Sequence, residues 1–309
     1  MRTLVTGGAG FIGSHIVDAL VGVGHEVSVI DNLSTGLKEN VNPQAKFYKV
    51  DILDERGLER IFKKERPEAV FHLAAQIDLR QSIDEPVFDS RVNILGSLSL
   101  LECARDYKVK KFVFSSTGGA IYGEAKRIPT PESSPANPAS PYGLAKLTVE
   151  KYLEIWQQLY GLEYIALRYS NVYGPRQRGG AESGVVAIFA TKALKGDSIA
   201  IYGDGEQTRD YVYIEDAMGA NLAALESKKS GVYNIGTSME TTVNEVFTEI
   251  SNLVGSEVEA TRTAAIKGEL LRSALDCSKA KKDLDWEPQI SLGDGLKGTL
   301  DFFRGKLNV

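Results

Sequence analysis

A glycine-rich turn between two apolar runs constrains this chain more than any other feature. The first run, residues 3–6, leads directly into three glycines at three-residue intervals, Gly7, Gly10 and Gly13. The second run, residues 26–30, ends at Asp31. Such a turn lets backbone N–H groups at a helix start approach a pyrophosphate, and the carboxylate is spaced to bind a ribose hydroxyl. An ordinary tight turn and a solvated strand end are the alternative interpretations. The combination predicts a dinucleotide site.

The residues after Asp31 favour one form of the dinucleotide. Asn32 and Leu33 follow it, and the first arginine beyond is Arg56. A 2′-phosphate needs a nearby positive charge. The sequence therefore predicts NAD rather than NADP.

Short β-branched runs alternate with helix-length amphipathic segments through the first half of the chain. The expected strands are Leu4–Thr6, Glu26–Ile30, Lys46–Val50, Ala69–Leu73, Lys111–Ser115 and Tyr164–Arg168. The expected helices include His15–Gly22, Leu58–Lys64, Val92–Tyr107, Tyr142–Tyr160 and, near the end, Leu292–Arg304. This alternation predicts an α/β fold with a doubly wound parallel sheet. We expect a Rossmann domain over residues 1–170. Residues 171–309 should form mainly a smaller C-terminal α/β substrate lobe, with some segments returning to the Rossmann domain.

Composition narrows the possible partners and compartments. The 309 residues include 36 Lys and Arg against 41 Asp and Glu, a net charge of −5, which argues against nucleic acid or an anionic membrane surface as partner. The two cysteines lack CxxC spacing and the three histidines lack ligand spacing, so we expect neither disulfide nor metal. The first strand follows Met1 directly, and no 18-residue apolar segment occurs, so we expect a cytoplasmic protein.

Tyr142 and Lys146 stand four residues apart at the start of an expected helix and so share one face. A tyrosine with a pKa of about 10 acts as a base near neutrality only after a shift of roughly 3 units, or about 4 kcal/mol, which nearby positive charge supplies. Lys146 and an oxidised nicotinamide could supply that charge. An ordinary amphipathic helix is the alternative, but the preceding dinucleotide half favours a catalytic pair.

Thr117 closes the buried run 111–115 after two serines and precedes Gly118 and Gly119. Its hydroxyl is expected at the carboxyl edge of the sheet, where ligands bind in open α/β folds. We interpret Thr117 as a proton relay, with simple turn formation as the alternative.

Together these segments resemble the extended short-chain dehydrogenase/reductase family, and within it the UDP-glucose 4-epimerase type. The resemblance covers nearly the whole chain. Its motifs are TGGAGFIGSH at 6–15, DNLSTG at 31–36, Asp51-Ile52, HLAAQ at 72–76, SSTGGAIYGE at 115–124, SPYGLAK at 140–146, RYSNVYGPRQ at 168–177 and RDYVYIEDA at 209–217.

The resemblance implies a role for each matching position. The cofactor NAD would be lined by Gly7, Gly10, Phe11, Ile12, Gly13, Asp31, Asn32, Leu33, Ser34, Thr35, Gly36, Asp51, Ile52, Leu73, Ala74, Ala75 and Gln76, with Asp51 and Ile52 at the adenine. Tyr142 would be the base, Lys146 its ribose-bound helper, and Thr117 the partner of the sugar 4-hydroxyl. The UDP part would be held by Asn171, Val185, Ile201, Tyr202 and Arg209.

Arg209 has a physical reason to be there, because a guanidinium fork suits a diphosphate and the adjacent Asp210 could orient it. A surface salt bridge between these two neighbours is the alternative interpretation. Many epimerases carry an arginine where this chain has Ile266, two residues before Gly268-Glu269, and we expect Arg272 to be the second diphosphate contact instead.

Ser273 stands where some epimerases carry a bulky tyrosine, so a 2-acetamido sugar is expected to fit. The resemblance also implies a homodimer paired through the helices Val92–Tyr107 and Tyr142–Tyr160, although helices that face their own sheet show the same pattern.

The implied activity is an isomerase of EC 5.1.3 type, which epimerises a UDP-hexose at C4 through a transient 4-keto sugar. Family dehydratases carry an Asp-Glu pair beside the strand-end threonine, and this chain has Gly118 and Gly119 there, leaving Glu124 as a more distant acid. A 4,6-dehydratase and a UDP-glucuronate-processing enzyme stay open as alternatives. A non-catalytic NAD-binding sensor would have no need of Thr117, Tyr142 and Lys146 together.

Overall fold

A parallel sheet of seven strands forms the centre of the computed structural model, which describes residues 1–178, 184–255, 258–266 and 270–307. The strand order is β11-β6-β5-β4-β1-β2-β3, and each neighbouring pair runs parallel. The strands are β1 (Arg2–Thr6), β2 (Glu26–Ile30), β3 (Lys46–Tyr48), β4 (Ala69–His72), β5 (Lys111–Thr117), β6 (Glu163–Tyr169) and β11 (Gly231–Ile235). The chain order reverses between β1 and β4, which creates the crevice where such sheets bind ligands. The predicted doubly wound sheet is confirmed.

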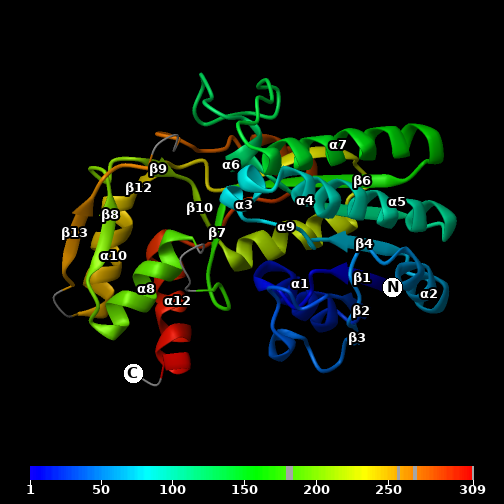
Figure 1. Ribbon diagram of the computed structural model, residues 1–309, viewed down its shortest axis with the longest axis horizontal. Helices are drawn as coiled ribbons and strands as arrows, with labels where there is room; N and C mark the ends of the chain where they lie inside the picture. Colours follow the sequence, from blue (N-terminus) through cyan, green and yellow to red (C-terminus); the bar gives the residue numbers. More distant parts are fainter. Residues whose placement is uncertain (179–183, 256–257, 267–269, 308–309) are drawn as a thin grey trace.

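Helices cover both faces of this sheet (Figure 1). Alternate strand residues point to opposite faces: Val5 joins the core beneath α1 (Phe11–Gly22), and Leu4 joins the core on the other side. With α1 pack α9 (Ile214–Glu226) and α11 (Ser278–Leu284). The other face carries α2 (Glu55–Glu65), α5 (Gly96–Asp106) and α7 (Pro141–Tyr160). Strands buried on both faces explain why their sequences are continuously apolar.

The helix expected over Val92–Tyr107 is more complex than its periodicity predicts. Helical backbone runs from α4 (Pro86–Ser90) through a π-helical turn (Arg91–Leu95) into α5. A π turn inserts one residue into the α-helical repeat, which breaks the 3.6-residue pattern at this point. The short helices η1 (Lys38–Asn40), α3 (Leu79–Asp84) and α6 (Gly118–Ile121) complete this half.

Most of the second half forms a smaller lobe with its own apolar core, seen at the left of Figure 1. Its elements are β7 (Asn171–Tyr173), α8 (Val185–Lys195), β8 (Ile199–Tyr202), β9 (Thr208–Arg209), β10 (Tyr211–Tyr213), β12 (Thr241–Thr242), α10 (Val243–Val254), β13 (Ala260–Thr263) and α12 (Leu292–Leu307). Small two-stranded sheets join β10 to β7, β12 to β9 and β13 to β8. No helix among the described residues is both long and apolar enough to cross a membrane.

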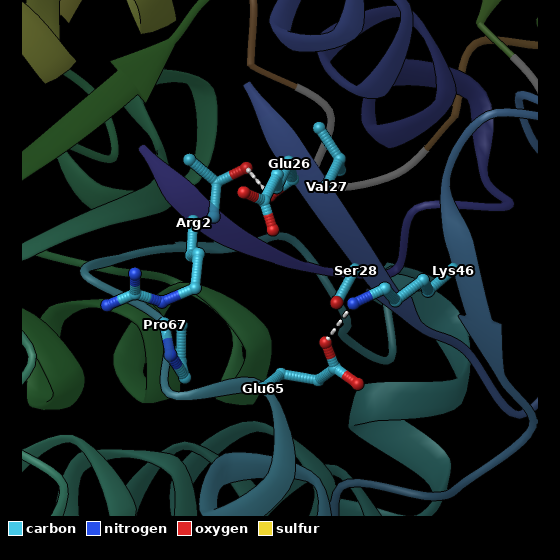
Figure 2. A pocket seen from close by; sticks show the side chains of 8 residues that line it. Arg2, Glu26, Val27, Ser28, Lys46, Glu65 and Pro67 are labelled. Atoms are coloured by element: carbon cyan, nitrogen blue, oxygen red, sulfur yellow. Dashed lines mark hydrogen bonds and ion pairs between the residues drawn. The ribbon is translucent and has the colours of Figure 1, made fainter. Parts of the chain in front are cut away.

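A small pocket lies at the amino-terminal edge of the main sheet (Figure 2). It is lined by the first residues of three strands, Arg2, Glu26 and Lys46, and the Lys46 ammonium donates to Glu65 at 2.7 Å. Its volume of about 10 Å³ holds at most one water molecule. Ligand binding is therefore expected at the opposite, carboxyl-terminal edge of the sheet.

Candidate active site

The glycine turn after β1 brings three backbone segments into close contact. Gly7 lies at φ +70°, and a Cβ there would be 2.7 Å from the Ala74 nitrogen. A Cβ at Gly13 would be 2.2 Å from the Gly7 carbonyl oxygen. Helix α1 has Gly10 at its N-cap, with no side-chain cap and no acidic residue in its first turn, so the positive end of the helix faces the turn. Only glycine fits these contacts, and the cradle suits a pyrophosphate.

The segment after β2 folds around the Asp31 carboxylate. Asp31 is 7% exposed and accepts hydrogen bonds from the backbone nitrogens of Ala9 (3.0 Å) and Leu33 (2.8 Å). A Cβ at Gly36 would lie 2.9 Å from Asp31 Oδ1, so this position is restricted to glycine. Asp31 is thus fixed beside the glycine turn, while Ser34 and Thr35 are exposed beyond it.

The segments after β2 and β3 are joined by one side-chain hydrogen bond. The Asn32 amide donates to Asp51 Oδ2 at 2.8 Å, and Asp51 Oδ1 accepts from the Leu53 nitrogen at 2.9 Å. Ile52 is buried against α5, because a Cβ at Gly96 would lie 2.6 Å from its Cδ1. The structure therefore brings Asp51 and Ile52 to the same edge as Asp31.

A chain of buried hydrogen bonds fixes the end of β4. The Ala74 nitrogen donates to Thr6 Oγ1 at 3.2 Å, and that hydroxyl lies 2.7 Å from His72 Nδ1. His72 Nε2 lies 2.8 Å from Ser97 Oγ, whose own proton goes to the Asn93 carbonyl at 2.6 Å. These partners place the His72 proton on Nε2. Burial lowers the pKa of His72 to about 3, so this ring is neutral and structural.

Asn93, which sequence reasoning missed, holds the segment that follows. Its Oδ1 accepts from the Gln76 nitrogen and its Nδ2 donates to the Gln76 carbonyl, both at 2.9 Å. One side chain thereby satisfies both backbone groups of a predicted cofactor-lining residue. Asn93 lies in the π-helical turn, a feature frequently found at functional sites, but its partner is 17 residues away.

Tyr142 and Lys146 lie together at the carboxyl end of β5. Lys146 is 4% exposed, and its ammonium donates to the Ser115 carbonyl at 2.8 Å and lies 5.9 Å from the Tyr142 ring centroid. Thr117 is the last residue of β5 and caps α6 by accepting from the Ala120 nitrogen at 3.3 Å. Tyr142 and Lys146 therefore share one face of α7, near the end of the strand that carries Thr117.

The charges around this pair favour a protonated tyrosine. Burial and the negative charge of Asp89 raise the pKa of Tyr142. Burial lowers the pKa of Lys146 to about 8, against the opposing effects of Asp89 and Glu150. The net effect of the chain's own residues is thus to raise the Tyr142 pKa, opposite to what the expected base role requires, and further positive charge is needed.

Local sequence fixes the start of α7 where Tyr142 sits. Ser140 Oγ accepts from the Gly143 nitrogen at 3.1 Å, and Pro141 occupies the first turn. A Cβ at Gly143 would lie 2.3 Å from the Ala120 carbonyl oxygen, so α7 approaches α6 closely only with glycine there. These contacts hold Tyr142 against the end of β5.

A buried ion pair anchors α7 one turn beyond Lys146. Arg168 on β6 donates to Glu150 Oε1 at 2.9 Å and to Oε2 at 2.6 Å, and Ser116 Oγ donates to the same carboxylate at 2.5 Å. Arg168 also donates to the Tyr122 hydroxyl at 2.8 Å. Removing one partner of such a pair costs about 3–5 kcal/mol, because a buried charge is left uncompensated.

The predicted nucleotide-binding residues of the lobe have varied exposure. Asn171 and Tyr202 are exposed and Val185 is half-buried, whereas Ile201 is 1% exposed and its side chain belongs to the lobe core. Any ligand contact of Ile201 therefore has to use its backbone.

Arg209 is oriented by carbonyl groups, since its guanidinium donates to the Thr208 and Leu270 oxygens at 2.8 Å each. The Asp210 carboxylate, expected to orient Arg209, accepts instead from the Thr237 nitrogen at 2.7 Å and from the Leu275 nitrogen at 3.1 Å.

Arg272 borders an open cleft of about 550 Å³ between the segments 124–128 and 270–272. It is exposed and pairs with Glu240 at 2.5 Å. Ser273 is half-buried next to it. Glu124, the more distant acid, lines the same cleft. Gly268 and Glu269, which anchor the alignment of this segment, lie outside the described residues.

A Rossmann sheet with a glycine cradle and a Tyr–Lys pair at its carboxyl edge defines a dinucleotide-dependent protein of the short-chain dehydrogenase/reductase class. A model of the NAD dependent epimerase/dehydratase family matches residues 3–236, and the chain belongs to this family.

Three similar proteins extend this comparison. A UDP-glucose 4-epimerase of Mycolicibacterium smegmatis is 43% identical over 312 residues, which cover 99% of each chain. The solved structure of a Thermotoga maritima UDP-glucose 4-epimerase with UDP-glucose is 53% identical with a TM-score of 0.98, covering 99% of this chain and 100% of that one. The Thermus thermophilus UDP-glucose 4-epimerase in complex with NAD is 46% identical with a TM-score of 0.94, covering 99% of each chain.

Proposed function

We propose that this protein is an NAD-dependent 4-epimerase of a UDP-hexose that interconverts the glucose and galactose forms. The observation that carries the proposal is the likeness over 99% of the chain to proteins described as UDP-glucose 4-epimerases, combined with Tyr142 and Lys146 side by side at the end of β5. The glycine cradle and the Asp31 carboxylate suit NAD.

The chain's residues manage one proton and the position of the sugar. Tyr142 takes the proton of the sugar 4-hydroxyl and later returns it, while Thr117 holds that hydroxyl by a hydrogen bond. Lys146 contributes an ammonium group beside the Tyr142 ring, which favours the phenolate. NAD held by the glycine cradle and Asp31 would supply reversible hydride transfer at sugar C4 and the positive charge of its oxidised ring.

The lobe is proposed to hold the UDP part firmly and the hexose loosely. The proposed contacts to the nucleotide are Asn171, Val185, Tyr202 and Arg209, with Arg272 as a second cation. Strong contacts to the hexose would oppose the rotation of the 4-keto sugar in the site. Binding energy is therefore more useful when it comes from contacts to the nucleotide.

The residues beside Thr117 disfavour a 4,6-dehydratase. At Gly118 a Cβ would lie 2.4 Å from Leu275 Cδ1, so an acidic side chain there would displace Leu275. Elimination of water needs an acid and a base near the sugar, and Gly118 and Gly119 provide neither.

The test is a panel of UDP-sugars (glucose, galactose, their N-acetyl forms, glucuronate and xylose) incubated with the NAD-loaded protein and separated by ion-pair chromatography. We expect interconversion of the glucose and galactose forms, with kcat reduced at least about 100-fold in Tyr142→Phe. Tyr152→Phe, on the same helix, is the matched control and should keep activity. Formation of a 4-keto-6-deoxy sugar, or equal activity of Tyr142→Phe and Tyr152→Phe, would contradict the proposal.

A second copy of the chain is the proposed partner. Large apolar side chains are exposed along α3, α4, the π turn and α7, which pack together: Leu79, Ile83, Val87, Phe88, Leu95, Leu144, Ile155 and Leu159. Apolar surface of this extent on adjacent helices marks an interface. We therefore propose a homodimer paired through these helices.

The two cysteines are buried free thiols, which suits the reducing cytoplasm as the compartment of this protein.

A further inference from the structure

Asp89 is a fully buried carboxylate at the first turn of a five-residue helix, and the proposed mechanism does not use it. Asp89 is 0% exposed. Its Oδ1 accepts from Asn93 Nδ2 at 2.9 Å and from Gln76 Nε2 at 3.1 Å. Its Oδ2 is buried and has no hydrogen-bond donor among the described residues. A half-satisfied buried carboxylate is costly, so a functional reason for its retention should be sought.

The residues bonded to Asp89 belong to the cofactor edge of the site. Gln76 is a proposed cofactor-lining residue, and Asn93 holds its backbone on both sides. Asp89 therefore hydrogen-bonds both the Gln76 side chain and the Asn93 side chain that holds the Gln76 backbone, and so fixes the segment after β4. Its helix, α4, also packs against α7, which carries Tyr142 and Lys146.

Asp89 is a counter-charge to Lys146, and its hydrogen bonds are to amide groups; burial raises the pKa of Asp89, and the positive charge of Lys146 opposes that rise. The described groups that act on the Lys146 ammonium are Asp89, Glu150 and His72. Glu150 is committed to its bidentate pair with Arg168, and His72 is neutral. The other charged residues of the elements packed on α4 are Arg80 and Asp84 on α3, Arg91 in the π turn, and Lys151 and Glu154 on α7. All are exposed except Glu154, which is half-buried and pairs with Lys151 at 3.0 Å.

We propose that Asp89 is a positioning residue that fixes the Gln76 segment through Asn93 and sets the charge state of the Tyr142–Lys146 pair. This inference rests on the proposed function. Asp89 acts through other groups, because its hydrogen bonds are to Asn93 and Gln76, and its negative charge acts on Tyr142 and Lys146 from a helix that packs against α7.

The sign of the effect follows from the two groups. The Asp89 charge raises the pKa of Lys146, which burial holds at about 8, so losing that charge makes Lys146 give up its proton at lower pH. The Asp89 charge also raises the pKa of Tyr142, so its loss makes the phenolate form at lower pH. Both limbs of a bell-shaped pH profile of kcat should therefore move toward acid.

The experiment compares pH profiles of kcat for the wild-type protein and Asp89→Asn. The substitution keeps the shape of the side chain and an oxygen acceptor for Asn93 and Gln76 while it removes the charge. We expect both limbs to move to lower pH, and the ratio of kcat at pH 9 to kcat at pH 7 to fall several-fold, with little change in KM. Asp89→Glu, which keeps the charge, should restore the wild-type limbs.

The matched control is Asp216→Asn, since Asp216 is another buried carboxylate and binds the Gln289 and Ile290 nitrogens at 2.9 and 3.0 Å. It should leave the pH profile unmoved. A uniform loss of kcat in Asp89→Asn at every pH, or no change at all, would overturn the inference in favour of a merely structural role.

A readout independent of activity separates this inference from the proposed function. We expect a double-mutant cycle of urea unfolding with Asp89→Asn, Lys146→Met and the double variant to show favourable coupling between the two side chains. Coupling in a protein without epimerase activity would leave the charge pairing intact and refute only the proposed function. If the changes in unfolding free energy of the two single variants simply add up in the double variant, the charge pairing of Asp89 with Lys146 is refuted.

Discussion

Ser273 is the residue proposed to decide which hexose the site accepts. It is a half-buried small side chain between buried Ala274 and exposed Arg272, and Arg272 lines the open cleft. A small residue leaves room for a 2-acetamido group, whereas a tyrosine would fill that room.

We therefore expect Ser273→Tyr to lower kcat/KM for the N-acetylated UDP-hexoses about tenfold or more relative to the plain ones, because a filled pocket rejects the larger sugar sterically. Chromatography of both substrate pairs measures this ratio. Ser273→Thr, with a much smaller increase in volume, is the control. An unchanged ratio in Ser273→Tyr would remove Ser273 as a specificity residue.

Single residues of the site differ in how far sequence could predict them. Tyr142 and Lys146 were predictable because their four-residue spacing lies within one helix, and Asp31 because it ends a strand after the glycine turn. Asn93 and Asp89 were not, since their partner Gln76 is 17 and 13 residues away and only the fold brings them together. The carboxylate of Asp210 was assigned to the wrong neighbour for the same reason, as Leu275 is 65 residues away.

At the scale of elements, buried strands were the easiest features to predict. Five of the six expected strands start or end at the same residue as in the structure. All of these except the edge strand β3 are apolar runs buried on two faces, which leaves little ambiguity. β11 was not predicted, since Gly231–Ile235 lies far along the chain among lobe segments, yet it pairs with β6 at the sheet edge. The π turn was not predictable, because it departs from the period on which the helix prediction rests.

The exposed apolar residues of α3, α4 and α7 lead to a prediction about association. Val87 is 73% exposed on α4, and a charge there would have to be desolvated at the proposed interface. We expect Val87→Glu to weaken dimerisation about tenfold or more in sedimentation equilibrium.

Val23→Glu is the control for this prediction, since Val23 is also exposed, at 59%, but lies at the end of α1. It should leave the dimer intact. A monomeric wild-type protein at micromolar concentration, or equal behaviour of the two variants, would contradict the proposed interface.

At the scale of the whole molecule, the sheet and the lobe divide the proposed work. The sheet edge carries the glycine cradle, Asp31, Thr117 and the Tyr142–Lys146 pair, and the lobe carries Arg209 and its neighbours. If the cofactor is held at the sheet and the UDP part of the substrate at the lobe, the hexose is free to present either face to the cofactor. The reaction is then a closed cycle, in which the hydrogen removed from C4 returns to C4.

The most direct test of this account follows the hydrogen at C4. UDP-glucose deuterated at C4 is incubated with the NAD-loaded protein in ordinary water, and the product is examined by NMR and mass spectrometry. We predict UDP-galactose that retains deuterium at C4, since the hydride never exchanges with solvent. A product carrying protium at C4, or the absence of any conversion by NAD-loaded protein, would contradict it.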